Sequence, residues 1–462
     1  MTGLAAVLAD LEEAHDRILA ELIEFAAIPS VSTDPAHAAD LEAAAAWVAA
    51  KLQAAGPFTV RTIATPGASV VYAEWLGAPG APTALIYGHY DVQPADPVEL
   101  WHSPPFRPTV RDGRLYARGV SDDKGPMLIP IKVAEAFFAA QRRLPINVKF
   151  MIEGEEEIGS RHLEPFVAQH RELLGADMVI SADGAMWRID EPSLTVANRG
   201  LAGLELTVRG PAKDLHSGRH GGSIANPLHA MARLIASLHR PDGRVAVTGF
   251  YDRVRELSAD ERAEIAALPF DEATYLGQVG AAAAIGEPGY TTLERQWTRP
   301  TLEVNGMWGG YQGPGQKTVV PSVAHAKITC RLVPDQDPDE VVALVARHLE
   351  RHVPAGARIT ITPGDPGARP CHIDRDNRTL KAAAAALEAT CGVAPRFVRM
   401  GGTLPVAEIF QRLLGLDTVY FSFSTGDEDF HAPNEFFRVH RLHQGLEAWA
   451  RLWDHLGQRA AS

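Results

Sequence analysis

Cysteine is scarce in this sequence, with three residues in 462: Cys330, Cys371 and Cys391. They are too few and too scattered for a disulfide framework, and no two have the Cys-x-x-Cys spacing of a structural zinc site. This cysteine usage fits a reducing compartment, so we predict a cytoplasmic protein.

Long apolar runs and basic stretches are also missing. No segment approaches the roughly 18 consecutive apolar residues that cross a bilayer. The first thirty residues carry six acidic side chains, which is the wrong pattern for a secretory signal and indicates an amphipathic helix. The net charge is −13, and no basic run is interleaved with aromatic residues. We therefore expect neither a membrane nor a nucleic acid as partner.

What is present is a long chain of ordinary globular composition. At roughly 150 residues per domain, 462 residues correspond to about three domains or two large ones. Hydrophobic residues make up 46% of the chain and charged residues 22%. These values are close to the averages of globular proteins, so a large buried core is expected.

Strand-like and helical patterns alternate in the first part of the chain. Apolar or β-branched runs at 83–87, 146–152 and 178–181 predict strands, and 126–141 predicts a helix between the first two. A fourth run of this kind, 418–423, lies near the C-terminus. Such alternation predicts an α/β fold with a parallel sheet flanked by helices.

The middle of the chain follows a different pattern. Residues 204–209 and 324–333 predict strands, and 227–238 and 338–352 predict helices. Because the first pattern returns afterwards, we predict one α/β domain in two parts, 1–200 and 365–462. An α+β domain, 201–364, is inserted between them, and the breaker-rich stretch 363–367 ends it.

Histidine and carboxylate residues follow the ends of the predicted strands. His89 follows the first strand, the acidic run 155–157 the second, and Asp183 the third, while His431 follows the fourth through a loop. Ligand sites collect at the carboxyl ends of strands in open α/β sheets. A lone histidine there would mean little, but four such ends and Asp122 in a glycine-bounded turn together predict a functional site.

Two imidazoles and several carboxylates without a thiolate are a ligand set for zinc, and manganese or cobalt also accept it. A carboxylate shared by two ions about 3.5 to 4 Å apart would let them hold a bridging water and a substrate oxygen. A free carboxylate is then needed as general base. Glu156 and Glu157 can divide these roles if they lie in a loop. The competing interpretation of 155–157 is a solvated acidic run.

Four segments together resemble a family of di-metal peptidases. They are 87–94 (Tyr-Gly-His-Tyr-Asp-Val-Gln-Pro), 118–125 (Arg-Gly-Val-Ser-Asp-Asp-Lys-Gly), 156–160 (Glu-Glu-Ile-Gly-Ser) and 431–435 (His-Ala-Pro-Asn-Glu). This family includes carnosine dipeptidase, cytosolic non-specific dipeptidase, aminoacylase and acetylornithine deacetylase. The resemblance runs in order across nearly the whole chain. It implies a zinc-peptidase-like catalytic domain with a mostly parallel sheet, and an inserted lid through which the chain forms a homodimer.

The resemblance also implies two divalent metal ions per subunit, with zinc expected and manganese or cobalt as alternatives. His89 and Asp183 match the ligands of one ion, and Glu157 and His431 match those of the other. Asp122 matches the carboxylate that bridges both ions.

Two further roles come from the same resemblance. Glu156 matches the general base, and Asp91 matches the carboxylate that orients the ring of His89 by accepting from its other nitrogen. The peptide bond between Asp122 and Asp123 is expected to be cis.

In the insert, His216 matches a histidine that helps to stabilise the oxyanion. Other positions that match substrate contacts are Thr318, Arg331, Arg399 and Thr403. Without the resemblance, Arg331 would be an ordinary surface arginine on a strand. The sequence departs from the dipeptidase relatives at Met400, where they commonly have an acidic residue, and at Thr403, where they have serine.

These features predict a metal-dependent dipeptidase that acts on dipeptides or short peptides. The alternative is a deacylase that removes an acyl group from an N-acylated amino acid by the same attack on an amide carbonyl. In this family, aspartate at the Asp183 position is associated with peptidases and glutamate more with deacylases and carboxypeptidases, which favours the first. A non-catalytic binding protein on the same fold is a remote alternative, because Glu156 and all five ligands are present.

Two other patterns resemble functional motifs incompletely. The glycine-rich stretch 310–318 nearly spells a phosphate loop, but Gln316 moves the lysine out of register. His348 and His352 are four residues apart on a predicted helix, but no glutamate follows His348 as in a zincin motif. We predict an exposed helix face for this pair.

Overall fold

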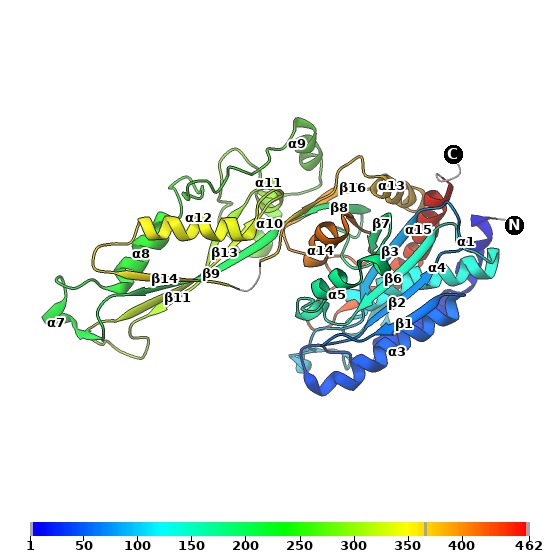
Figure 1. The fold of residues 1–462 in the computed structure, drawn as a ribbon, viewed down its shortest axis with the longest axis horizontal. Coiled ribbons are helices and arrows are strands. Elements are labelled where there is room, and N and C mark those ends of the chain that lie inside the picture. The colour runs from blue at the N-terminus through cyan, green and yellow to red at the C-terminus, as the bar shows by residue number, and fades with distance from the viewer. Residues whose placement is uncertain (1–2, 365–366, 459–462) are drawn as a thin grey trace. The chain divides into compact units, whose positions relative to one another are not determined.

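A computed structural model describes residues 3–364 and 367–458 (Figure 1). The chain divides into two units. The first comprises the described parts of Met1–Val196, Ile373–Val398 and Ile409–Ser462, and the second comprises Ala197–His372 and Arg399–Glu408. Asp365 and Pro366, at the predicted end of the insert, lie outside the described residues, as do Met1 and Thr2.

The first unit contains nine strands and eight helices, together with part of a ninth helix, α14, within its described residues. The strands are β1 (Thr59–Ile63), β2 (Val70–Trp75), β3 (Thr83–His89), β4 (Thr109–Arg111), β5 (Arg114–Tyr116), β6 (Asn147–Glu153), β7 (Met178–Ser181), β17 (Thr418–Tyr420) and β18 (Phe436–Arg438). The helices are α1 (Leu4–Glu13), α2 (His15–Ala26), α3 (Ala38–Ala55), α4 (Gly125–Gln141), α5 (Leu163–Gln169), α6 (Arg171–Leu174), α13 (Arg378–Cys391), α14 (Pro405–Leu414) and α15 (Val439–Gln458).

A six-stranded sheet forms the centre of the first unit, in the order β1-β2-β6-β3-β7-β17. Strands β6, β3, β7 and β17 run parallel, whereas β1 and β2 pair antiparallel at one edge. All of β6 and nearly all of β3 are buried, as expected for parallel strands that are covered on both faces. The predicted α/β fold with a mostly parallel sheet is confirmed.

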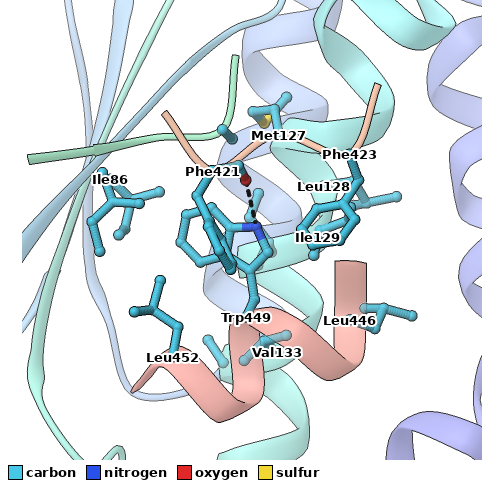
Figure 2. Close-up of a cluster of buried hydrophobic side chains, with 14 of the residues drawn as sticks. Ile86, Met127, Leu128, Ile129, Val133, Phe421, Phe423, Leu446, Trp449 and Leu452 are labelled. Carbon is cyan, nitrogen blue, oxygen red and sulfur yellow. Dashed lines mark hydrogen bonds between the residues drawn. The ribbon is translucent and has the colours of Figure 1, made fainter. Parts of the chain in front are cut away.

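Neighbouring side chains of β3 contact helices on opposite faces of the sheet. Ile86 belongs to a buried cluster with Leu128 of α4 and Trp449 of α15 (Figure 2). Trp449 satisfies its ring nitrogen by donating to the backbone oxygen of Phe421 at 3.1 Å. Tyr87 points the other way, as the next residue of a strand must, and meets the ring of Phe410 edge-on at 5.7 Å.

The N-terminal segment forms two helices where the acidic, amphipathic pattern predicted one. α1 and α2 meet at Ala14, whose backbone N–H is shared between the carbonyl oxygens of Asp10 and Leu11. Each helix buries an apolar stripe of its own: Val7 and Leu11 in α1, and Ile18, Leu22 and Phe25 in α2. The prediction of a single helix is therefore wrong.

The second unit has these elements: β9 (Gly200–Arg209), β10 (Leu215–His216), α7 (Ser217–His220), α8 (Pro227–Ser237), α9 (Ala259–Ala266), α10 (Glu272–Val279), α11 (Thr292–Thr298), β11 (Thr301–Gly309), β12 (Val319–Val320), β13 (Val323–Leu332), α12 (Pro338–Arg351), β14 (Arg358–Pro363) and β15 (Cys371–His372). Strands β8 (Ser193–Asn198) and β16 (Arg396–Met400) contain residues at which the chain passes between the units.

An antiparallel sheet in the order β11-β13-β9-β14 forms the centre of the second unit. Strands β9 and β13 alternate buried and more exposed residues, so the sheet buries one face under α8 and α12. Arg399–Glu408 also belongs to this unit, although the sequence analysis placed these residues in the C-terminal part of the first domain. The reason is a set of contacts within the unit, such as the ion pair between Arg399 and Glu261 at 2.9 Å.

His348 is buried, so the predicted exposed face is wrong for this residue. Its ring stacks on His352 with centroids 4.1 Å apart, and its Nε2 lies 3.0 Å from the backbone oxygen of Ser237 in α8. Helix α12 therefore turns this position onto α8.

The helices that the structure describes include none with the length and apolar character to cross a bilayer.

Candidate metal centre

The parallel strands place the first predicted ligands at one edge of the sheet. His89 is the last residue of β3 and lies opposite Glu153, the last residue of β6. On the other side of β3, Tyr87 lies opposite Ser181, the last residue of β7, and Asp183 follows two residues later. The carboxyl ends of three neighbouring strands therefore meet at this edge.

Asp122 reaches the same edge from the turn Val120–Lys124 that precedes α4. Its backbone leaves the helical conformation, with φ −124° and ψ 91°. The peptide bond between Asp122 and Asp123 is cis, as the sequence analysis predicted.

The five predicted ligands form two groups that share Asp122. In one group, ligand atoms of His89, Asp122 and Asp183 lie within 4.8 Å of one another, and in the other those of Asp122, Glu157 and His431 do. Asp122 Oδ1 lies 3.1 Å from His89 Nε2, and Asp122 Oδ2 lies 3.1 Å from His431 Nε2. The two oxygens of one carboxylate thus face two imidazoles from different parts of the chain.

The charges of this centre are suited to divalent cations. Burial raises the pKa of Glu156 well above its usual range, and it also raises that of Glu157 and brings that of Asp183 to about 6. Hydrogen bonds to Asp122 and Glu157 raise the pKa of His431 to about 10. Four buried or half-buried carboxylates outnumber two imidazoles here, and bound metal ions would balance the excess negative charge. The donor set of imidazole nitrogens and carboxylate oxygens fits zinc.

Asp91 connects His89 to the acidic loop. His89 Nδ1 lies 3.1 Å from the backbone oxygen of Asp91 and 3.3 Å from its Oδ1. Nδ1 faces these oxygens and Nε2 faces Asp122 Oδ1, so with an ion bound Nδ1 would carry the ring proton and Nε2 would supply the lone pair to the metal. The Asp91 carboxylate also accepts the backbone N–H groups of Glu156 at 3.2 Å and Glu157 at 3.1 Å. No pattern in the sequence predicted this second contact.

The acidic run 155–157 is not a solvated one. Glu155 is buried and lies 2.7 Å from His162, and the Glu157 side chain is also buried. Glu156 and Glu157 begin the short 3-10 turn Glu156–Ile158 that follows β6, so they lie in a loop, which is the condition for the two roles predicted for them. Gln93 donates to Glu157 Oε2 at 2.8 Å. Gln93 belongs to the motif 87–94, and no role for it was predicted from the sequence.

Two more residues were missed in the same way. Arg118 and Glu435 are each 1% exposed and form an ion pair at 2.7 Å. They lie in the motifs 118–125 and 431–435, so membership of a motif was the available signal.

Two of the predicted substrate contacts meet in a two-stranded ribbon of the second unit. His216 is the last residue of β10, which pairs with β12. Thr318 immediately precedes β12. The side chain of His216 is exposed, and its Nδ1 accepts the backbone N–H of Gly218 at 3.0 Å. The proton of the neutral ring is therefore on Nε2.

The other three predicted contacts lie elsewhere in the second unit. Arg331 is half-buried and donates to Thr403 Oγ1 at 2.9 Å, and Thr403 donates to the backbone oxygen of Arg199 at 2.7 Å. Arg331 is thus held by a partner rather than loose on the surface. Arg399 is buried and donates from Nη2 to Glu261.

Comparison with known proteins identifies the family of this chain. Residues 85–455 match the family described as Peptidase family M20/M25/M40. The chain belongs to this family. It is 31% identical to a human Beta-Ala-His dipeptidase over 84% of this chain and 78% of that protein. A Cys-Gly metallodipeptidase of Saccharomyces cerevisiae is 28% identical over 97% of both chains.

A solved structure adds a third comparison for this member of the M20/M25/M40 family. The metallo-carboxypeptidase Sso-CP2 of Sulfolobus solfataricus has a TM-score of 0.82 and 32% identity, covering 96% of this chain and 99% of that one. The predicted family is confirmed.

Proposed function

We propose that this protein hydrolyses the peptide bond of dipeptides or short peptides with two bound divalent metal ions. The observation that carries the proposal is the position of Asp122, whose two oxygens each lie 3.1 Å from a different imidazole nitrogen. Such a carboxylate can serve two ions at once. Relatives that align over most of the chain are named as dipeptidases.

Five residues would hold the ions. His89 and Asp183 would hold one ion, Glu157 and His431 the other, and Asp122 both. Bound ions would polarise the substrate carbonyl and lower the pKa of a water molecule. Zinc is the expected ion, and manganese or cobalt would fit the same oxygen and nitrogen donors.

Glu156 would act as general base. Burial raises the pKa of its carboxyl, and a raised pKa suits a group that must accept a proton and then give it up near neutral pH. Glu156 would take the proton of the attacking water and deliver it to the leaving amine. Asp91 would fix the backbone of this residue while orienting His89.

Residues of the second unit would bind the substrate. His216 has Nε2–H free to donate, because Nδ1 accepts the N–H of Gly218. Such a donor would stabilise the negative charge that develops on the attacked carbonyl oxygen. The other proposed contacts are Thr318, Arg331, Arg399 and Thr403.

We further propose that the inserted segment 201–364 is a lid through which the protein forms a homodimer. We also propose that the protein is cytoplasmic, in keeping with its three free cysteines.

Two other amide hydrolases remain candidates. Likeness to the carboxypeptidase Sso-CP2 favours testing removal of C-terminal residues from longer peptides. Deacylation of N-acylated amino acids requires the same attack on an amide carbonyl.

A substrate panel with metal restored tests the proposal. Metal-free protein is supplied with zinc, manganese or cobalt and given dipeptides, N-blocked peptides, and acetyl and succinyl amino acids. The dipeptides include β-alanyl-histidine and cysteinylglycine, after the names of the relatives. We expect amino acids to be released from dipeptides, and not by the Glu156→Gln variant. Release from acyl amino acids alone would make the protein a deacylase, and no release from any substrate would favour a binding protein.

A further inference from the structure

A buried ion pair crosses between two of the loops that carry the predicted metal ligands. Glu435 precedes β18, whose first residue, Phe436, lies opposite Tyr116, the last residue of β5. This pairing brings the chain after Tyr116, which leads to Asp122, beside the chain after His431. Positions more than three hundred residues apart in the sequence therefore meet here.

The Glu435 carboxylate accepts four hydrogen bonds from residues 118–122, the loop that carries Asp122. Its Oε1 accepts the backbone N–H groups of Ser121 at 3.0 Å and Asp122 at 3.2 Å. Its Oε2 accepts the N–H of Gly119 at 2.8 Å and Nη1 of Arg118 at 2.7 Å. Four donors on two oxygens satisfy the acceptor capacity of an ionised carboxylate.

Arg118 extends this link to two more ligand loops. Its Nη2 donates to the backbone oxygen of Ala432 at 3.1 Å, next to His431. Its Nε donates to the backbone oxygen of Pro94 at 3.2 Å, in the loop that follows His89. The pair of Arg118 and Glu435 thus contacts the loops of three predicted ligands.

His431 needs such support because its own side chain is about half exposed. Its backbone has φ +58°, a left-handed conformation that is unfavourable for a residue with a side chain. The contact of Arg118 with Ala432 restrains the loop directly after this position.

We infer that Glu435 is a positioning residue, which with Arg118 holds the bridging carboxylate of Asp122 and the ring of His431 in place for metal binding. The inference rests on the proposed two-metal function. It predicts that a small change at Glu435, which is not one of the five predicted ligands, weakens the binding of both ions.

Glu435→Gln is the sharpest variant, because it keeps the shape of the side chain. The amide nitrogen of glutamine would face N–H donors whichever way it is turned, so backbone groups that fix Asp122 would lose an acceptor. We expect zinc to bind about 10- to 100-fold more weakly, as is usual when a residue that supports metal ligands is changed. Calorimetric titration of chelator-stripped protein measures this, and the visible spectrum of the cobalt-loaded protein should change with the ligand geometry.

Glu287→Gln is a matched control. Glu287 is buried in the second unit and binds Arg299 through both oxygens, at 2.7 and 2.9 Å. The same substitution there breaks a buried pair of the same kind away from the predicted ligands. Zinc affinity and the cobalt spectrum should match those of the wild-type protein, so a loss of stability alone cannot produce the expected difference.

Two results would overturn this inference and leave the proposed function standing. One is that folded Glu435→Gln protein has the zinc affinity and cobalt spectrum of the wild-type protein. The other is that Glu287→Gln weakens zinc binding as much as Glu435→Gln does. If Glu435→Gln does not fold, Arg118→Lys keeps the positive charge and loses the contacts with Ala432 and Pro94. Weaker zinc binding by this variant supports the inference, and unchanged binding overturns it. A wild-type protein that binds no zinc, manganese or cobalt would contradict the proposed function as well.

Discussion

Asp91 accepts the backbone N–H of Glu156 at 3.2 Å, and its own backbone oxygen lies 3.1 Å from Nδ1 of His89. One residue therefore fixes both a predicted metal ligand and the predicted general base. All of Asp91 and His89 is buried, so water does not replace either contact. Asp91 therefore links the loop of the predicted base to the predicted ligand His89.

Asp91→Asn should reduce both metal binding and turnover. The amide group would place N–H atoms against the N–H of Glu156 or Glu157 and would orient the His89 ring less well. We expect zinc affinity to fall about 10- to 100-fold. Hydrolysis should remain slow at saturating zinc, because the Glu156 backbone is also displaced. Recovery of the full rate at saturating zinc would show that Asp91 acts only by orienting His89 and does not position Glu156.

Glu156→Gln should keep both metal ions and lose most of the rate. Glutamine has the same shape but cannot accept a proton at neutral pH, and loss of general acid–base catalysis costs about 10² to 10⁴-fold. Elemental analysis and the dipeptide assay on the same preparation measure the two effects separately. A nearly normal rate would assign the base to another residue.

Asp122→Ala should remove more metal than substitution of any other single ligand, since Asp122 is the residue shared by both groups. His431→Ala is the matched comparison, because His431 belongs to one group only. Elemental analysis after gel filtration should give less metal in Asp122→Ala than in His431→Ala. Two ions per chain in Asp122→Ala would show that this residue does not bridge them.

His216→Ala should retain both ions and lose rate, because His216 is a predicted donor to the oxyanion and not a ligand. If His216 serves the neighbouring subunit, mixing this variant with Glu156→Ala under conditions that exchange subunits should restore activity. Half of the dimers would be mixed, each with one complete site of two, so about a quarter of the wild-type rate should return for a two-fold dimer. Absence of recovery despite demonstrated exchange would place His216 in its own subunit or outside the active site.

The site-bearing strands could be predicted from local sequence. The runs at 83–87, 146–152 and 178–181 are apolar enough to be buried on both faces, and they correspond to β3, β6 and β7 within two residues at each end. Because parallel strands end at a common edge, the convergence of His89 and Asp183 followed from the order of the strands.

Contacts between distant segments could not be predicted in this way. No periodicity in the sequence reveals that Phe436 pairs with Tyr116, which is what brings Glu435 to the loop of Asp122. The run 418–423 was predicted as a strand throughout, but β17 ends at Tyr420. Beyond it, Phe421 still donates to Ser181 O, and Phe423 is buried with Trp449. The run is therefore apolar beyond Tyr420 because Phe421 and Phe423 pack in the core, although they are not part of the strand.

Stepwise return of zinc to metal-free protein tests the central claim most directly. Cleavage of a dipeptide that the wild-type protein hydrolyses is measured against the zinc added per chain. A site of two ions that share Asp122 predicts negligible cleavage without metal, and a rate that stops rising at two equivalents. A rate that levels off at one equivalent would show that one ion is sufficient for hydrolysis. Cleavage by metal-free protein at the untreated rate would contradict metal-dependent hydrolysis altogether.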